Sequence, residues 1–359
     1  MKTFREMVNS LKKERQSGIE LLRICAALGV VYGHFLNTGG LFTNASISGV
    51  NYGVMTLIRS IVIASVDIFV IISGYFLCTT QNRSIGKPLN LLLQISVFSV
   101  VLTVILSILG FQKFSVNGLL SAIIPSNWFV TLYIVLYLIS PYMNVIYKNL
   151  SVNTWKYFIG ILLLLFSIWP TVLGVADHFG VPFTKGLSTM GHGGNNAGYT
   201  IVNFITLYSI GAFVRYNDLD KKLNVKLAIL LAFICVILLW GIRFIPMNTQ
   251  PWHIAGWYDN ILVILLATML FVIFKRINIR SSFVNKLAKA AFTCYIIHKF
   301  FFKMISPEDV LVMPLIKALG FIFLFSIGVY MVSWCLFMIF DVSVGKFLKK
   351  LDEKPLNLV

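Results

Sequence analysis

The amino-acid sequence predicts an all-α membrane protein, a bundle of about ten transmembrane helices with both termini in the cytoplasm. Of its 359 residues, 58% are hydrophobic and only 12% are charged, whereas soluble domains are about one quarter charged. Most of the apolar runs reach the roughly 20 residues that cross a bilayer. Helices are the expected spanning element because lipid offers the backbone no hydrogen-bond partners. The runs occupy residues 18–38, 54–78, 89–110, 128–147, 156–175, 199–215, 226–245, 256–274, 286–304 and 314–340.

The distribution of basic residues predicts which loops face the cytoplasm. The N-terminus and every second loop carry 22 Lys and Arg residues, and the alternate loops carry 5. Because cytoplasmic loops carry an excess of these residues, we expect cytoplasmic basic segments at 1–17 and 346–359, flanking a transmembrane domain at 18–345. Among the outward segments, 176–198 is rich in Gly and Asn. That composition fits either a sugar contact or a linker.

Charge and cysteine usage exclude several classes of protein. The net charge is +17, but the basic residues lie between apolar runs, so membrane lipids with anionic headgroups are their expected partners and nucleic acid is not. The five cysteines lie in or beside apolar runs and form no CxxC pair. This argues against a disulfide framework or a zinc site, and we expect no metal.

The first apolar run contains three ionisable residues, which are costly in lipid and therefore candidates for function. Arg23 and His34 are eleven residues apart, so they share one helical face and are separated by about 16 Å along the axis. Glu20 lies three residues before Arg23, within helical pairing distance. The pattern fits a positive charge at the mouth of a site and a base deep within it. A snorkelling arginine and a packed histidine fit it equally well.

The second apolar run adds Asp67, Ser73 and Gly74. Asp67 and Gly74 are seven residues apart and therefore lie on one face. A buried carboxylate can orient a histidine, as it does around metal sites. For Ser73 and Gly74, a close helix-packing contact is at least as good an interpretation as chemistry.

Several segments, taken in order, resemble the acyltransferase-3 family of bacterial membrane acyltransferases, many of which O-acetylate surface polysaccharides. Arg23 and His34, with ten residues between them, resemble the signature of the family's first helix. Residues 69–74 (Phe-Val-Ile-Ile-Ser-Gly) resemble its Phe-Phe-x-x-Ser-Gly motif, with Val70 in place of the second Phe. Weaker matches lie at 128–142, 207–213 and 291–298. The resemblance covers nearly the whole chain and includes the family's count of ten helices.

The resemblance implies a function in the bacterial cytoplasmic membrane. An acyl group, most often acetyl, would pass from cytoplasmic acetyl-CoA or another acyl-CoA to a hydroxyl of a cell-surface glycan or lipid-linked oligosaccharide. His34 is then the expected general base, and Asp67 would hold its reactive tautomer. The remaining site residues divide into donor ligands (Arg23, Glu20, Ser73 and Gly74) and acceptor ligands (Trp128, Tyr133 and His298).

The third helix departs from the family pattern. Many members carry a basic cluster at its cytoplasmic start, but residues 87–94 hold only Lys87. Arg83, or the loops at 215–226 and 275–289, are therefore the alternative ligands for the donor's phosphates.

The competing interpretation is a polysaccharide or lipid-linked sugar transporter, which would also be polytopic and basic. Transporters often show internal repeats and broken helices near the midplane, and the sequence contains no clear case of either.

Overall fold

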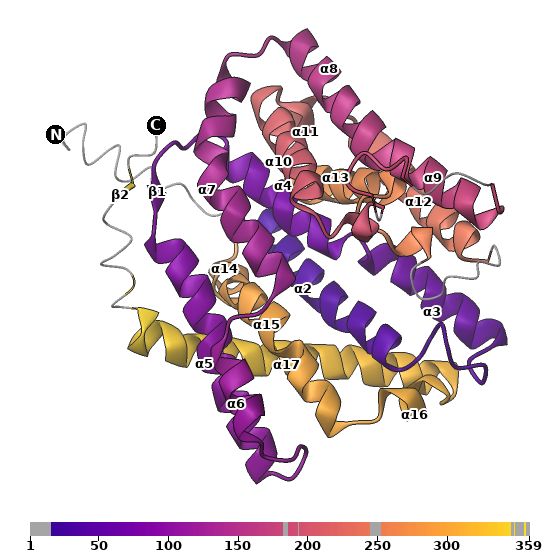
Figure 1. The fold of residues 1–359 in the computed structure, drawn as a ribbon, viewed down its shortest axis with the longest axis vertical. Coiled ribbons are helices and arrows are strands. Elements are labelled where there is room, and N and C mark those ends of the chain that lie inside the picture. The colour runs from indigo at the N-terminus through magenta and orange to yellow at the C-terminus, as the bar shows by residue number, and fades with distance from the viewer. Residues whose placement is uncertain are drawn as a thin grey trace.

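The structure of the chain, a computed structural model, is α-helical apart from one pair of two-residue strands in the part that it describes (Figure 1). The predicted cytoplasmic segments 1–17 and 346–359 lie almost entirely outside this part, so their bounds stay predictions. The described residues are 16–181, 186–192, 194–244, 253–345, 348 and 355–356.

Each of the ten apolar runs forms helix in the described residues, which confirms the all-α membrane fold. Eight spans are long and apolar enough to cross a bilayer. Single helices form four of them: α2 (Ser17–Thr38), α5 (Gly86–Ile108), α12 (Val225–Arg243) and α17 (Leu315–Ser343). Composite spans form the other four: α3 (Gly49–Val62) with α4 (Ser65–Leu77), α6 (Val116–Ile123) with α7 (Trp128–Lys148), α8 (Val152–Leu163) with α9 (Trp169–His178), and a short 3₁₀ turn (Ile254–Gly256) with α13 (Ile261–Lys275).

The sixth and ninth runs are shorter than a full span. The sixth is α10 (Ile201–Tyr216). The ninth is broken into α14 (Ser282–Leu287), a 3₁₀ turn (Ala288–Ala290) and α15 (Ala291–Phe301). Two further short helices, α11 (Leu219–Lys222) and α16 (Pro307–Leu311), lie in loops.

Two predicted single helices contain irregularities. The second run turns at Ile63 and Ala64, between α3 and α4, although neither proline nor glycine occurs there. The fifth run contains a π-helical turn (Leu164–Ile168) between α8 and α9. Pro170 follows that turn, and its missing N–H and bulky ring account for the loss of regular α-helical bonding.

Two facing glycines allow α4 and α10 to pack backbone to backbone. A Cβ on Gly74 would lie 2.2 Å from the Tyr208 carbonyl oxygen, and a Cβ on Gly211 would lie 2.2 Å from the Ile71 carbonyl oxygen. Small residues permit this approach between transmembrane helices. The Tyr208 hydroxyl also donates a 2.8 Å hydrogen bond to Asn144 on α7. These contacts fix the short α10 in the interior.

Figure 1 shows α2 crossing the middle of the bundle, with α4, α10 and α13 on one side and α15 and α17 on the other. The side chains of α2 divide in the same way. Leu22 and Val30 belong to an apolar cluster that includes α4 and α13. Val31 and Phe35 belong to a second cluster with α15 and α17. The helix that carries Arg23 and His34 is therefore the central helix of the fold.

The loops predicted to be cytoplasmic contact one another. Ser281 donates its backbone N–H to the Ser17 hydroxyl at 3.0 Å, joining the 275–289 loop to the start of α2. Residues 355–356 pair as strand β2 (Pro355–Leu356) with β1 (Arg83–Ser84) in the 79–88 loop. These contacts place the loops together at one end of the bundle.

The loops predicted to face outward also contact one another. Asn51 donates to the Met313 carbonyl oxygen at 3.0 Å, and Lys303 donates to Gln112 at 2.5 Å. The chain thus alternates between the two ends of the bundle. Which end faces the cytoplasm stays a prediction.

Candidate active site

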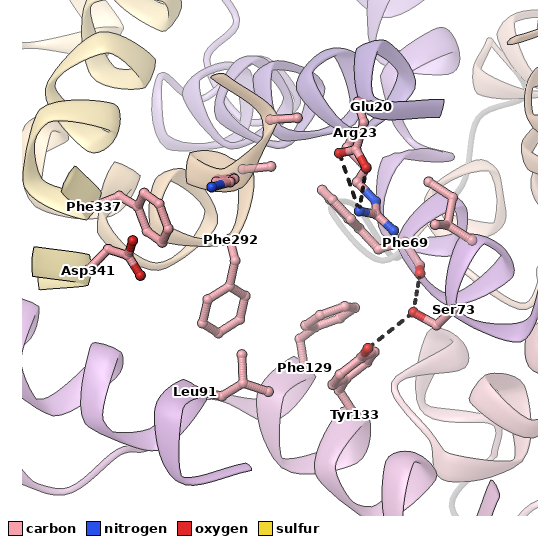
Figure 2. Close-up of a pocket in the computed structure, with 14 residues that line it drawn as sticks. Glu20, Arg23, Phe69, Ser73, Leu91, Phe129, Tyr133, Phe292, Phe337 and Asp341 are labelled. Atoms are coloured by element: carbon pink, nitrogen blue, oxygen red, sulfur yellow. Dashed lines mark hydrogen bonds and ion pairs between the residues drawn. The ribbon is translucent and has the colours of Figure 1, made fainter. Parts of the chain in front are cut away.

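A cavity of about 480 Å³ opens on the half of the bundle predicted to be cytoplasmic, and we call it the inner cavity. Figure 2 shows Arg23 and Ser73 on one side of it and Phe337 and Asp341 on the other. Four predicted site residues, Glu20, Arg23, Ser73 and Tyr133, line this one space. Its walls come from α2, α4, α5, α7, α15, α17 and the turn before α15: Glu20, Arg23, Phe69, Ile72, Ser73, Leu91, Phe129, Tyr133, Ala288, Lys289, Ala291, Phe292, Phe337 and Asp341.

Glu20 holds the guanidinium of Arg23 at the wall of the inner cavity. Nη1 of Arg23 lies 3.2 Å and 3.3 Å from the two carboxylate oxygens. The Glu20 side chain is buried, whereas 31% of the Arg23 side chain is exposed. The ring of Phe76 lies 5.9 Å from the guanidinium carbon. This fixed guanidinium keeps N–H groups available to an anionic ligand.

The two other polar residues at this wall contact each other. The Ser73 hydroxyl bonds the Phe69 carbonyl oxygen at 2.8 Å and the Tyr133 hydroxyl at 3.3 Å, so it joins α4 to α7. Tyr133, expected at the acceptor site, therefore lies in the inner cavity with the predicted donor ligands. Gly74, the next residue, faces away from the cavity and packs against the backbone of Tyr208 on α10. Its assignment to donor binding stays a prediction.

The second cation at the inner cavity is Lys289, from the 275–289 loop. Arg83 lies elsewhere: its guanidinium is buried and donates to the Ser140 hydroxyl at 2.6 Å and 3.1 Å and to the Thr80 carbonyl oxygen at 2.9 Å. Those bonds tie the loop before α5 to α7. Of the basic groups named as alternatives for the missing cluster, Lys289 is the one that lines this cavity.

His34 lies beside His298, deep in the bundle. The two ring centroids are 4.9 Å apart. Nδ1 of His298 lies 2.7 Å from the Tyr295 carbonyl oxygen, which can only accept, so Nδ1 carries the proton. Nε2 of His298 is then a lone-pair acceptor, and it is buried without a hydrogen-bond partner in the described residues. A second nitrogen fixed in this way is typical of histidines that handle protons.

Asp67 does not reach His34 in the structure. It is fully buried, and neither carboxylate oxygen has a hydrogen-bond partner among the described residues. The expected contact that would hold the tautomer of His34 is therefore not made, and His298 occupies the neighbouring position instead. A catalytic role for Asp67 stays a prediction.

A narrow passage, about 40 Å³ in volume, runs past His34 between α2, α3 and an aromatic cluster. It is lined by Gly29, Val30, Gly33, His34, Asn37, Arg59, Val62, Ile63, Ser65, Val66, Tyr199 and Tyr258. Trp128 stacks behind the two tyrosines, with its ring 4.3 Å from Tyr199 and 5.8 Å from Tyr258. The predicted acceptor ligand Trp128 thus supports the wall of this passage.

The two tyrosines are positioned by contacts between segments that are distant in sequence. The Asn195 side chain donates to the buried Asp259 carboxylate at 2.6 Å, and Tyr258 donates its backbone N–H to the Ala197 carbonyl oxygen at 3.0 Å. Gly198 has φ +81°, and a Cβ there would lie 2.5 Å from the Asp259 backbone nitrogen. Only glycine fits this turn.

The passage continues into an outer cavity of about 260 Å³, with which it shares Asn37, Arg59 and Tyr199. The outer cavity is lined by Asn37, Phe42, Thr43, Arg59, Ala197, Tyr199, Arg243, His253, Gly256 and Trp257. Sequence analysis did not select Arg59, Arg243 or Tyr199. Each comes from a different part of the chain, and no local spacing relates them.

Aromatic rings separate the inner cavity from the histidine pair. Phe129 lines the inner cavity and its ring lies 5.0 Å from that of Tyr295. Tyr295 in turn lies 6.1 Å from His298. The histidines thus lie between a space at one end of the bundle and a space at the other.

Comparison with known proteins agrees with this arrangement. No curated protein and no solved structure matches the chain. One family model does, with the description "Acyltransferase domain", and it covers residues 16–339. That match includes all ten apolar runs apart from the last residue of the tenth, and it confirms the resemblance on which the site residues were selected. The chain therefore belongs to the acyltransferase-3 family and is a multi-pass membrane acyltransferase.

Proposed function

We propose that this acyltransferase moves an acetyl group from cytoplasmic acetyl-CoA to a hydroxyl of a cell-surface glycan or lipid-linked oligosaccharide. The single observation that carries the proposal is the placement of the His34–His298 pair, half-buried and buried respectively, between two separate cavities. An enzyme that takes its donor from one side of a membrane and its acceptor from the other needs this division.

The donor binds in the inner cavity. Arg23 and Lys289 supply positive charge for the phosphates of CoA, and the Arg23 guanidinium can grip two phosphate oxygens at once. Phe129 and Phe292 line the same space and give an apolar wall to the pantetheine arm. His34 lies about 16 Å further along α2, so the arm would extend along this helix to place the thioester beside the histidines. The Phe129 and Tyr295 rings that separate the two spaces must move aside for it.

The histidine pair carries the chemistry. His34 accepts the proton of the acceptor hydroxyl, and the hydroxyl oxygen attacks the thioester carbonyl carbon. The tetrahedral adduct collapses, the carbon–sulfur bond breaks, and the CoA thiolate takes the proton back from His34. In the reacting complex the unpartnered Nε2 of His298 would accept a hydrogen bond from the other nitrogen of His34 and so keep the attacking tautomer. His298 then serves as the positioning residue expected of Asp67.

The acceptor approaches through the outer cavity and the passage. Tyr199 and Trp257 line the outer cavity and offer flat apolar surfaces to a sugar ring, as ligand pockets usually do. Trp128 supports Tyr199 from behind. The passage has room for only a few water molecules, so it must widen when an acceptor sugar enters.

The test is to supply membranes containing the protein with acetyl-CoA labelled in the acetyl group and to analyse the host's surface glycan by mass spectrometry. We expect labelled O-acetyl esters on the glycan, and none in membranes from cells that lack the protein. Glycan that reaches the surface without any label, in cells where its amount depends on the protein, would support the transporter interpretation and overturn this proposal.

A further inference from the structure

Two arginines from distant parts of the chain meet in the outer cavity. Arg59 projects from α3 and lines both the passage and the outer cavity. Arg243 is the last residue of α12, and only 4% of its surface is exposed. Its guanidinium carbon lies 4.4 Å from the centre of the Phe42 ring. Both arginines line the outer cavity, so two like charges face one small space.

Neither arginine has an acidic partner among the residues that the structure describes. In the described residues the ion pairs are Arg23–Glu20, Lys221–Asp218 and Lys275–Asp220. Nε of Arg59 and Nη1 of Arg243 are buried, and neither has a hydrogen-bond partner in the part of the chain that the structure describes. The outward segments that the structure does not describe, 182–185, 193 and 245–252, contain no Asp or Glu in their sequence. Arg243 is buried and Arg59 half-buried. A buried charge without a counter-ion is strongly destabilising, so the pair is incomplete until an anion binds.

We propose that the outer cavity binds an anionic sugar of the acceptor glycan, with Arg59 and Arg243 gripping its carboxylate or phosphate group. This inference rests on the proposed function and names the class of acceptor. Guanidinium groups bind carboxylate and phosphate oxygens in pairs, which fits a charge carried on a sugar. The rings of Tyr199 and Trp257 in the same cavity distinguish a sugar from a bare anion, because a sugar ring has apolar faces that pack on them.

The position of Arg59 connects the anion to the chemistry. A Cβ added to Gly33 would lie 3.8 Å from the guanidinium carbon of Arg59, and Gly33 is the residue directly before His34. An anion held by Arg59 is therefore bound next to the histidine that receives the hydroxyl proton. It follows that the acylated hydroxyl belongs to the charged sugar or to its immediate neighbour in the glycan.

The experiment measures binding of four small probes to the purified full-length protein in detergent. The probes are glucose, glucuronate, glucose 1-phosphate and glycerol 1-phosphate. We expect glucuronate or glucose 1-phosphate to bind at least tenfold more tightly than glucose, and which of them does identifies the anion. Glycerol 1-phosphate should bind more weakly than the sugar anion, because it has no ring to pack on Tyr199 and Trp257. Arg59→Gln and Arg243→Gln should each abolish the preference, and Lys113→Gln, the same loss of charge on an exposed loop residue, should keep it.

Three results would overturn the inference. In the first, no sugar anion binds more tightly than glucose, or the preference survives in both arginine variants. In the second, glycerol 1-phosphate binds as tightly as the sugar anions, which would indicate a lipid headgroup. In the third, CoA affinity falls tenfold in Arg59→Gln or Arg243→Gln, which would assign the pair to the donor. A preference for sugar anions in a protein that acetylates no glycan would leave this site in place and refute the proposed function instead.

Discussion

The inner and outer halves of the bundle hold their arginines in different ways. In the inner cavity, Arg23 is paired with Glu20 on the same helix. In the outer cavity, Arg59 and Arg243 come from separate helices and have no acidic partner among the described residues. The charge of Arg23 is balanced by Glu20, so the inner site is stable with or without a ligand. The charges of Arg59 and Arg243 are not balanced, so the outer site is stable only when an anion binds there. Under the proposed function, donor binding would be pre-organised and acceptor binding would complete the charge balance.

His34 lies between the two halves, and its replacement should lower the rate of acetyl transfer more than any other substitution discussed below. His34→Gln should lower acetyl transfer at least about 10²-fold, because general acid–base groups usually contribute that much or more. CoA affinity should be unchanged, since the inner cavity does not include His34. Steady-state acetylation and CoA calorimetry on the purified variant check both halves of this prediction. His192→Gln, the same exchange in an exposed outward loop, is the control and should behave as wild type.

Arg23 should affect donor binding alone. Arg23→Ala should weaken CoA binding by roughly 1.5–3 kcal/mol, the usual contribution of a charged hydrogen bond. The CoA affinity of Arg23→Lys should lie between those of Arg23→Ala and the wild type, because lysine keeps the positive charge but cannot bind two phosphate oxygens at once. Calorimetric titration with CoA measures the affinity of both Arg23 variants. The control is Arg243→Gln in the outer cavity, which should leave CoA affinity unchanged. Equal CoA affinity in Arg23→Ala and wild type would make Arg23 a structural residue.

A substitution at Gly74 distinguishes a role in helix packing from a role in donor binding. Gly74→Ala should destabilise the protein by about 1–3 kcal/mol, the usual cost of overpacking, because the new Cβ would meet the Tyr208 carbonyl oxygen. Thermal unfolding of the purified protein measures this, with Gly328→Ala as the control, since a Cβ there meets nothing within 4 Å. Lower CoA affinity in Gly74→Ala with unchanged thermal stability would instead support the predicted donor role.

The difference between the halves also explains what the sequence could predict. Glu20, Arg23 and His34 lie on one helix, and their spacing alone put them on one face. The fold was predictable for a similar reason, because each apolar run is local. Arg59 and Arg243 are 184 positions apart in the numbering, and only the contact of α3 with α12 brings them together. Likewise, the packing role of Gly74 and Gly211 can be recognised only once α4 and α10 are known to be neighbours.

The role expected of Asp67 illustrates the same limit. A buried carboxylate can orient a histidine, but the spacing of Asp67 relates it only to Gly74 on its own helix. In the structure α15 places His298 beside His34 instead. That placement depends on tertiary packing, which sequence spacing on a single helix does not contain.

The assignment of donor and acceptor sides depends on orientation, which labelling tests without any assay of activity. Ala45→Cys, in the outward segment 37–53, should react with a membrane-impermeant thiol reagent in intact cells. Lys221→Cys, in the 215–226 loop, should react only after the cells are opened. Both positions are exposed. The opposite pattern would exchange the inner and outer halves and the ligands proposed for them.

The central claim is that donor and acceptor meet at His34 from opposite sides of the membrane. The most direct measurement uses sealed vesicles of known orientation that hold the protein, with the host's glycan on the outward face and labelled acetyl-CoA on the cytoplasmic face. The account predicts labelled O-acetyl groups on the glycan in wild-type vesicles and none in vesicles with His34→Gln. Transfer that occurs only when acetyl-CoA and glycan are on the same side would contradict it.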